Sequence, residues 1–209
     1  MKYMKYILSV VAIFKNEESI LHEWLEHYLM EGVDHFYLID NGSTDNYQKI
    51  LEPYLQDGSV ELNIDTRPHM QEGHYNSYYL QKVKNEAEWV IVVDLDEFIY
   101  SREPFKTIVE YLGSLAMNVS QIYIPWKLFG SCGIIEQPKS CIDRFVMRTL
   151  YNHVKTNGMI NNDQILTKTI IRTKYLVKMS LHFSTTIVGT KEITSDNQVV
   201  HNKKEYHHI

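Results

Sequence analysis

Apolar and polar positions along the first 125 residues follow two periods, one typical of buried strands and one typical of helices. Short apolar runs rich in β-branched residues predict strands that are covered on both faces. Between these runs, apolar residues recur every three or four positions, which predicts helices with one buried stripe. In the first helix the stripe is Ile20, Leu21, Trp24, Leu25 and Tyr28. The predicted strands span 7–14, 36–39, 60–64, 89–93 and 122–124, and the predicted helices span 16–32, 47–54, 71–88 and 104–113.

Turn and capping residues mark where these helices begin and end. Asn16 is a candidate N-cap of the first helix, and the two glutamates that follow it suit the positive end of the helix dipole. Gly32 is a candidate stop for the same helix. Pro104 suits the start of the last helix, because its ring fixes a helical φ and the N–H it lacks needs no partner there.

The regular alternation of strand and helix predicts an α/β fold with a doubly wound, mostly parallel sheet. Residues 126–209 differ, because 145–150, 167–173 and 175–179 look like strands separated by polar stretches. We find no internal repeat and no linker. The chain is therefore interpreted as a single domain, 1–209, in which the last part is a small β extension or a lid.

Composition narrows the class of protein. The chain has 209 residues, of which 44% are hydrophobic and 22% charged, so a core can form, and its formal charge of −5 argues against a general nucleic-acid binder. Cys132 and Cys141 are too few for a disulfide framework and predict free thiols in a reducing compartment. The apolar run 7–14 is followed at once by charged residues, without a small-residue cleavage site, and no run is long enough to span a bilayer. We therefore expect a cytoplasmic protein without a membrane span.

Candidate chemistry lies where the predicted parallel strands end, because ligands of open α/β sheets bind at that edge. Three carboxylates within four residues follow the strand 89–93, and like charges crowded in a partly desolvated place are costly. A divalent cation would relieve the repulsion, and oxygen ligands favour Mg²⁺ or Mn²⁺ together with phosphate oxygens. The alternative is a solvated acidic turn. The polar residues at this edge are Lys15, Asn16, Asp40, Asn41, Ser43, Asp45, Asp94, Asp96 and Glu97.

Four further side chains each allow two interpretations. His182, in an otherwise apolar stretch, is either a third metal ligand or a satisfied core histidine. Asp40 either accepts a hydrogen bond from a nucleoside or bonds its own backbone in a tight turn. Lys168 and Arg172 either face a diphosphate as charge partners or lie on an exposed strand face.

The residues at the strand ends carry a resemblance to a known family. The stretches 11–18, 32–45 and 89–98, which includes Asp94-Leu95-Asp96-Glu97, resemble the family-2-like and family-92-like glycosyltransferases. The stretch 126–133 is also similar to theirs. The resemblance covers most of the first 135 residues, and beyond them only Lys168, Arg172 and His182 are similar.

The resemblance implies a GT-A fold, with a nucleotide-sugar-binding half at 1–125 and an acceptor-side half at 126–209. It implies that Asp94 contacts the ribose or the metal and that Asp96 coordinates Mn²⁺ or Mg²⁺ bound to the diphosphate of a nucleoside-diphosphate sugar. Uridine is the expected base, and a glycan or another hydroxyl compound the expected acceptor. The implied substrate-binding residues are Phe14, Asn16, Glu17, Asp40, Asn41 and Ser43 around the nucleoside, and Trp126, Gly130 and Ser131 beside the donor sugar and acceptor.

Transfer with inversion would also need a carboxylate base, for which Glu97 and Glu136 rank above Asp143; retention stays open. Two other functions remain alternatives. A haloacid-dehalogenase-like phosphohydrolase also has an aspartate at the end of an apolar strand, but Phe98 and the position of this segment after the fourth strand count against it. The other alternative is a module of the same fold that binds a sugar nucleotide or glycan without turnover.

Overall fold

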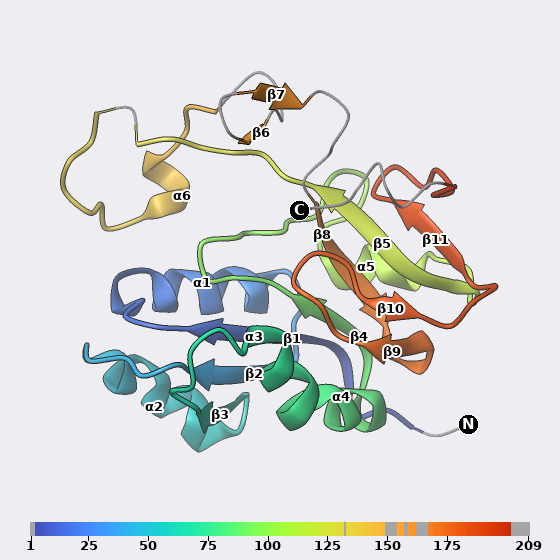
Figure 1. Ribbon diagram of the computed structural model, residues 1–209, viewed down its shortest axis with the longest axis horizontal. Helices are drawn as coiled ribbons and strands as arrows, with labels where there is room; N and C mark the ends of the chain where they lie inside the picture. The colour runs from blue at the N-terminus through green and yellow to red at the C-terminus, as the bar shows by residue number, and fades with distance from the viewer. Residues whose placement is uncertain (1–2, 132, 149–153, 157–158, 162–166, 202–209) are drawn as a thin grey trace.

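A seven-stranded sheet with helices on both faces forms the core of the computed structural model, which describes residues 3–131, 133–148, 154–156, 159–161 and 167–201 (Figure 1). The strand order is β11-β5-β8-β4-β1-β2-β3. Strands β1 to β5 and β11 run parallel, and β8 lies antiparallel between β4 and β5. The predicted α/β class with a mostly parallel sheet is therefore confirmed. The strands are β1 (Tyr6–Phe14), β2 (His35–Asp40), β3 (Val60–Ile64), β4 (Ala87–Val92), β5 (Val119–Pro125), β8 (Thr167–Arg172) and β11 (Lys191–Thr194).

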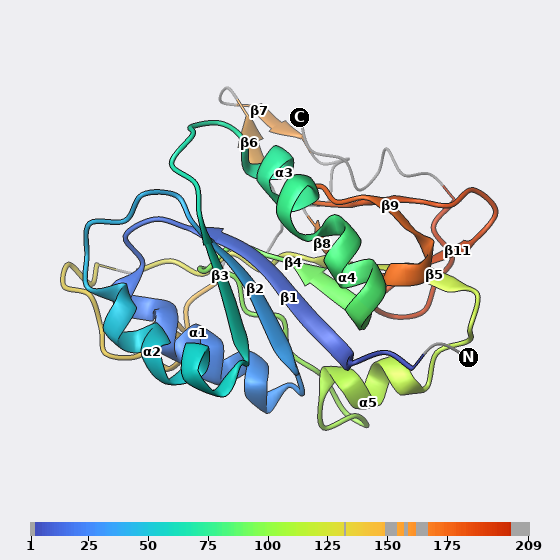
Figure 2. The ribbon, with the colours of Figure 1, turned by 90° about the horizontal axis from the view of Figure 1, so that it is seen from below.

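Helices cover both faces of the sheet (Figure 2). Figure 2 shows α1, α2 and α5 on one face and α3, the π-helix η1 and α4 on the other. The predicted stripe of the first helix is confirmed, because all five of its residues are buried in α1. None of the described helices is both long enough and apolar enough to cross a bilayer. The helices are α1 (Glu18–Met30), α2 (Tyr47–Asp57), α3 (Gln71–His74), η1 (Tyr75–Tyr79), α4 (Leu80–Glu86), α5 (Ile108–Gly113), α6 (Cys141–Arg144) and the 3₁₀-helix η2 (Thr173–Tyr175).

Two predicted helix starts are wrong. Asn16 does not cap α1: its φ is +59°, and its side-chain oxygen accepts a hydrogen bond from the Thr44 N–H at 2.7 Å instead. The helix predicted at 104–113 is α5, which begins at Ile108, four residues after Pro104. Thr107 is its N-cap and accepts a hydrogen bond from the Glu110 N–H. The predicted stop of α1 is confirmed. Gly32 has a φ of +90°, and a Cβ there would lie 2.8 Å from Val109.

The predicted helix 71–88 is divided into three parts. Its inner residues Tyr75, Tyr79 and Val83 are buried as expected, but η1 interrupts the α-helix between α3 and α4. Single π-turns inside α-helices are rare and are often found at functional sites. The strand that follows begins at Ala87, so the chain leaves α4 directly into the centre of the sheet.

The second half of the chain enters the main sheet instead of only extending it. All six residues of β8 are buried. The predicted strand 145–150 is not formed over its described residues, apart from a bridge between Phe129 and Arg148, and 149–150 lie outside them. Small two-stranded sheets are formed by β9 (Leu176–Lys178) with β10 (Thr185–Thr186) and by β6 (Val154–Thr156) with β7 (Met159–Asn161).

A buried histidine at the start of β2 predicts a pH dependence of stability. The His35 ring is stacked on Tyr6, with centroids 4.4 Å apart, and burial lowers its pKa below the ordinary 6.5. The unfolded chain therefore binds more protons near that pH, so stability is complete above pH 6.5 and is lost as the pH falls from there toward the folded-state pKa. We expect melting temperatures between pH 7.5 and 5.5 to fall less in His35→Phe than in the parent; equal slopes would contradict this.

Candidate functional site

A cavity of about 510 Å³ opens where β1, β2 and β4 end. The β1–α1 loop, the segment after β3 and the loop after β4 all contribute to its walls. Because these strands are parallel, their carboxyl ends bring the segments to one edge of the sheet. The charged residues that line the cavity are Lys15, Glu17, Arg67, Asp94 and Asp96, with His69 beside them.

Both aspartates of the predicted pair line this cavity. The Asp94 carboxylate is held from two sides: Oδ1 accepts a hydrogen bond from Gln71 Nε2 at 2.9 Å, and Oδ2 lies 2.8 Å from Lys168 Nζ. Asp96 is exposed. Glu17 brings a third carboxylate to the cavity, and its pKa is raised by burial first and by the nearby Asp96 second. The crowding expected from the sequence is thus present, and Lys168 relieves it on one side.

Glu97 supports the loop that carries this pair. Its Oε2 accepts a hydrogen bond from the Asp94 N–H at 3.0 Å and lies 3.2 Å from Lys168 Nζ. Its backbone oxygen accepts hydrogen bonds from Trp24 and Tyr28. Burial raises the pKa of the Glu97 carboxyl to about 7, although the lysine opposes the shift. The side chain is thus fixed between the loop and β8, and it is not among the residues that line the cavity.

Asn16 and Ser43 join the loops after β1 and β2. The Asn16 N–H donates to Ser43 Oγ at 3.0 Å, while the Asn16 side chain accepts from Thr44. In the same way the Glu18 N–H donates to Asp45 Oδ2 at 2.8 Å. These contacts fix the β1–α1 loop, whose residues Phe14 and Glu17 line the cavity. Asn16 and Ser43 therefore shape the site through the backbone.

Asp40 has both carboxylate oxygens engaged inside the protein. Oδ1 accepts a hydrogen bond from the Ser43 N–H at 2.7 Å, and Oδ2 accepts one from the Tyr47 hydroxyl at 2.9 Å. The side chain is buried. Of the two interpretations of Asp40, this geometry agrees with the tight turn.

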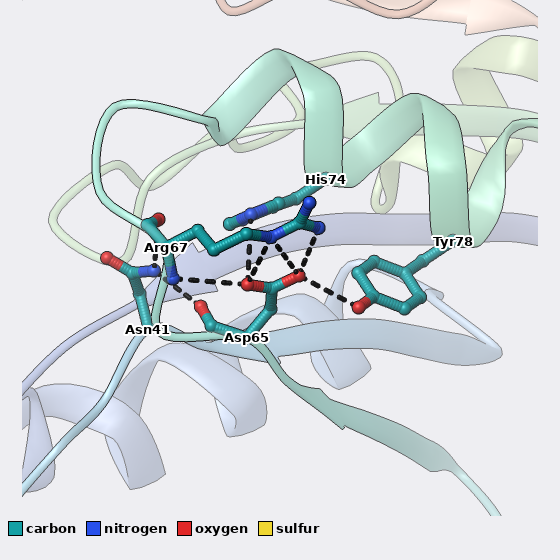
Figure 3. Close-up of polar contacts among 5 residues, drawn as sticks. All are labelled: Asn41, Asp65, Arg67, His74 and Tyr78. Carbon is teal, nitrogen blue, oxygen red and sulfur yellow. Dashed lines mark hydrogen bonds and ion pairs between the residues drawn. The ribbon is translucent and has the colours of Figure 1, made fainter.

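A polar cluster after β3 was missed in the sequence (Figure 3). Arg67, His74 and Tyr78 converge on the buried carboxylate of Asp65, with Arg67 Nε at 2.9 Å and the Tyr78 hydroxyl at 2.9 Å. The Arg67 guanidinium holds the pKa of Asp65 well below its usual range. Asn41 completes the cluster, because its amide donates to the backbone oxygens of Asp65 and Arg67. The position of Asp65 directly after a parallel strand was the signal that could have found it.

Lys168 connects the aspartate pair to two other predicted residues. Its Nζ lies 5.9 Å from the centre of the Trp126 ring, and the Trp126 and His182 ring centroids are 5.8 Å apart. Trp126 and His182 do not line the cavity. Over the described ranges, no three His, Cys, Asp or Glu side chains are grouped as a metal site, so the expected set Asp94, Asp96 and His182 is not assembled.

The remaining predicted residues lie elsewhere. Arg172 is at the opposite end of β8, stacked 4.2 Å above Trp89 and 3.2 Å from Glu88, so it does not join the cavity. Cys132 lies outside the described residues, and Cys141 is a free thiol. Four other predicted site residues are exposed on the segment between β5 and β6 and do not line the cavity: Gly130, Ser131, Glu136 and Asp143.

The family of the chain follows from a comparison with known proteins. The model of glycosyltransferase family 92 matches residues 5–208. The chain belongs to glycosyltransferase family 92. A family 92 protein of Ricinus communis is 30% identical over 97 residues, which are 46% of this chain and 17% of that protein. This family 92 chain spans less than half the length of the curated relatives it matches.

Solved structures also align with this family 92 chain. Staphylococcus aureus TarS 1–349 aligns over 80% of this chain and 47% of its own, with a TM-score of 0.49 and 17% identity. A mannosyltransferase of Pyrobaculum calidifontis, in complex with GDP-Man and Mn²⁺, aligns over 63% of this chain and 37% of its own, with a TM-score of 0.45 and 16% identity.

Proposed function

We propose that this family 92 member transfers a sugar from a nucleoside-diphosphate sugar, with UDP-sugar as the expected donor, to a hydroxyl group of a glycan or another acceptor. The observation that carries the proposal is the position of Asp94 and Asp96. Both line one cavity at the carboxyl ends of three parallel strands, together with the loop after β1. A nucleotide binds at this edge in open α/β sheets.

The residues of the cavity fit a divalent cation, Mn²⁺ or Mg²⁺. Such an ion commonly takes one or two protein carboxylates and completes its shell with phosphate oxygens and water. Asp94 and Asp96 would supply the carboxylates, and Glu17 in the same cavity adds negative charge that a cation would offset. When bound, the ion would neutralise charge that develops on the leaving diphosphate. Because His182 is not grouped with the two aspartates in the described part of the chain, we assign the protein ligands of this ion to Asp94 and Asp96 alone.

Cationic side chains stand near the aspartates. Arg67 lines the cavity with 60% of its side chain exposed, while Asp65 fixes one edge of its guanidinium. The remaining N–H groups of such a planar fork suit phosphate or carbonyl oxygens. Lys15 also lines the cavity. We infer that these two residues contact the nucleoside diphosphate, and that Lys168 keeps Asp94 in place. Glu97 and Glu136 stay candidates for an acceptor base.

Binding of nucleotides with and without metal tests this proposal. We expect UDP or UDP-sugar to bind in Mn²⁺ and its affinity to fall at least about 10-fold in EDTA, because the two carboxylates would then repel the phosphates. Isothermal titration calorimetry with UDP and GDP measures both effects. Equal affinity without metal would overturn the role given to Asp94 and Asp96. Metal-dependent binding without turnover would support the non-catalytic module, and release of phosphate from simple monoesters would support the phosphohydrolase.

A further inference from the structure

The π-helix η1 carries an asparagine that bonds a distant part of the chain. Asn76 accepts a hydrogen bond from the Met179 N–H at 2.9 Å and donates one to the Met179 carbonyl at 2.8 Å. The same amide nitrogen donates to the Glu72 carbonyl at 2.6 Å, one turn back along the helix. A single side-chain amide therefore takes both backbone groups of one residue 103 positions away.

A second side-chain amide makes the same pair of contacts with Ser184, five residues after Met179. Gln121 of β5 accepts a hydrogen bond from the Ser184 N–H at 2.8 Å and donates to the Ser184 carbonyl at 3.2 Å. Gln121 is fully buried, and its amide also donates to the Tyr123 hydroxyl. Met179 and Ser184 are both buried, whereas the residues between them are half-buried. Segment 179–184 is thus fastened at its two ends by two-sided amide contacts.

We propose that Asn76 and Gln121 are positioning residues that hold segment 179–184 as a fixed wall beside the site and thereby place His182 against Trp126. A chain of contacts connects this segment to the cavity. The ring centroids of His182 and Trp126 are 5.8 Å apart, Lys168 Nζ lies 5.9 Å from the Trp126 ring centroid, and the same Nζ lies 2.8 Å from Asp94 Oδ2. The effect on transfer rests on the proposed function, whereas the effect on Trp126 does not.

A purely structural explanation is the competing one. Buried backbone N–H and C=O groups need partners, and an amide side chain can provide them wherever a loop crosses the interior. Loss of either amide would then lower stability and change nothing at Trp126. The test must therefore measure the surroundings of Trp126 directly.

Tryptophan fluorescence reports on this position because the other two tryptophans, Trp24 and Trp89, are buried. We expect Asn76→Ala and Gln121→Ala to raise the acrylamide quenching constant of Trp126 about twofold, because the segment beside it opens locally. The same variants in a Trp126→Phe background provide the baseline. Where the parent shows turnover, we expect kcat to fall about 10- to 100-fold with donor KM little changed, as for misplaced supporting groups.

Asn63→Ala is the matched control. The Asn63 side-chain amide donates a hydrogen bond at 2.7 Å to the hydroxyl of Tyr79, which lies in the same π-helix as Asn76. The variant removes this bond and leaves the two amide contacts of segment 179–184 in place. Unchanged quenching in the two variants, or equal changes in the control, would overturn the proposal. If the variants fail to fold, amide hydrogen exchange of the parent protein tests the proposal. We expect the Met179 and Ser184 amides to be as protected as those of β4. Exchange at the rate of an exposed loop would refute the claim that segment 179–184 is held at both ends. A parent without turnover but with the expected quenching would refute only the proposed function.

Discussion

An Asp96→Asn variant is expected to lose about 100-fold of its donor turnover while it folds like the parent, because the proposed cation site would lose one of its two carboxylates. Asp96 is exposed in the cavity and contributes to the repulsion that raises the pKa of Glu17. Removing the charge of Asp96 therefore reduces repulsion in the folded protein, while it weakens binding of the proposed cation. Release of UDP from a UDP-sugar at fixed Mn²⁺ measures the loss, and a thermal melt measures the stability.

Raised Mn²⁺ separates loss of the ion from loss of chemistry. Because Asp94 remains, we expect the variant to regain part of its turnover as Mn²⁺ increases, whereas the parent is saturated. Glu52→Gln, which removes an exposed carboxylate on α2, is the control for a change of net charge. An Asp96→Asn protein with parental turnover, or one that melts far below the parent, would contradict the site as described.

The strand ends of the first half could be predicted from sequence because each depends on local pattern alone. Apolar runs identify parallel strands, and the rule that their carboxyl ends share an edge brings Phe14, Asn41, Asp94 and Asp96 together without further information. The cavity confirms that grouping. The same rule applied to β3 would have added Asp65, which directly follows Ile64.

The contribution of β8 could not be predicted, because it depends on partners far along the chain. Its neighbour β4 lies about 80 residues earlier, and nothing local encodes that it enters antiparallel between β4 and β5. Antiparallel entry places Lys168 at the edge with Asp94 and Arg172 at the other edge with Glu88. Two cations that look equivalent in sequence are therefore separated by the length of the strand.

Side-chain competition explains why the local turns were misread. Asn16 is a residue type that often caps helices, but its side-chain oxygen Oδ1 accepts a hydrogen bond from the Thr44 N–H of another loop. Asp40 has the position of a nucleoside ligand, but Tyr47 and the Ser43 N–H occupy its oxygens. Propensity states what a side chain can bind, whereas tertiary contacts decide which partner it meets.

Lys168→Met is expected to cause the largest loss of stability, about 2–3 kcal/mol, because it removes the ammonium group shared by two carboxylates. Lys168 has 2% of its side chain exposed, against 39% for Asp94 and 16% for Glu97, and solvent at Asp94 reduces the loss from the value for a fully buried pair. In a protein of this size this corresponds to a fall in melting temperature of roughly 5–10 °C.

The pH dependence of that loss distinguishes charge from packing. Lys168 lowers the pKa of Glu97, so in Lys168→Met the folded-state pKa rises further above about 7. A raised carboxyl pKa means that the folded state binds more protons, so the destabilisation relative to the parent is smallest at pH 6 and grows toward pH 8. We expect Lys168→Arg to retain most of the stability. We expect Lys82→Met, at the partly exposed pair with Glu61, to cost less than about 1 kcal/mol. A loss in Lys168→Met that is the same at pH 6 and pH 8 would show that the methylene chain, and not the ammonium, holds the site together.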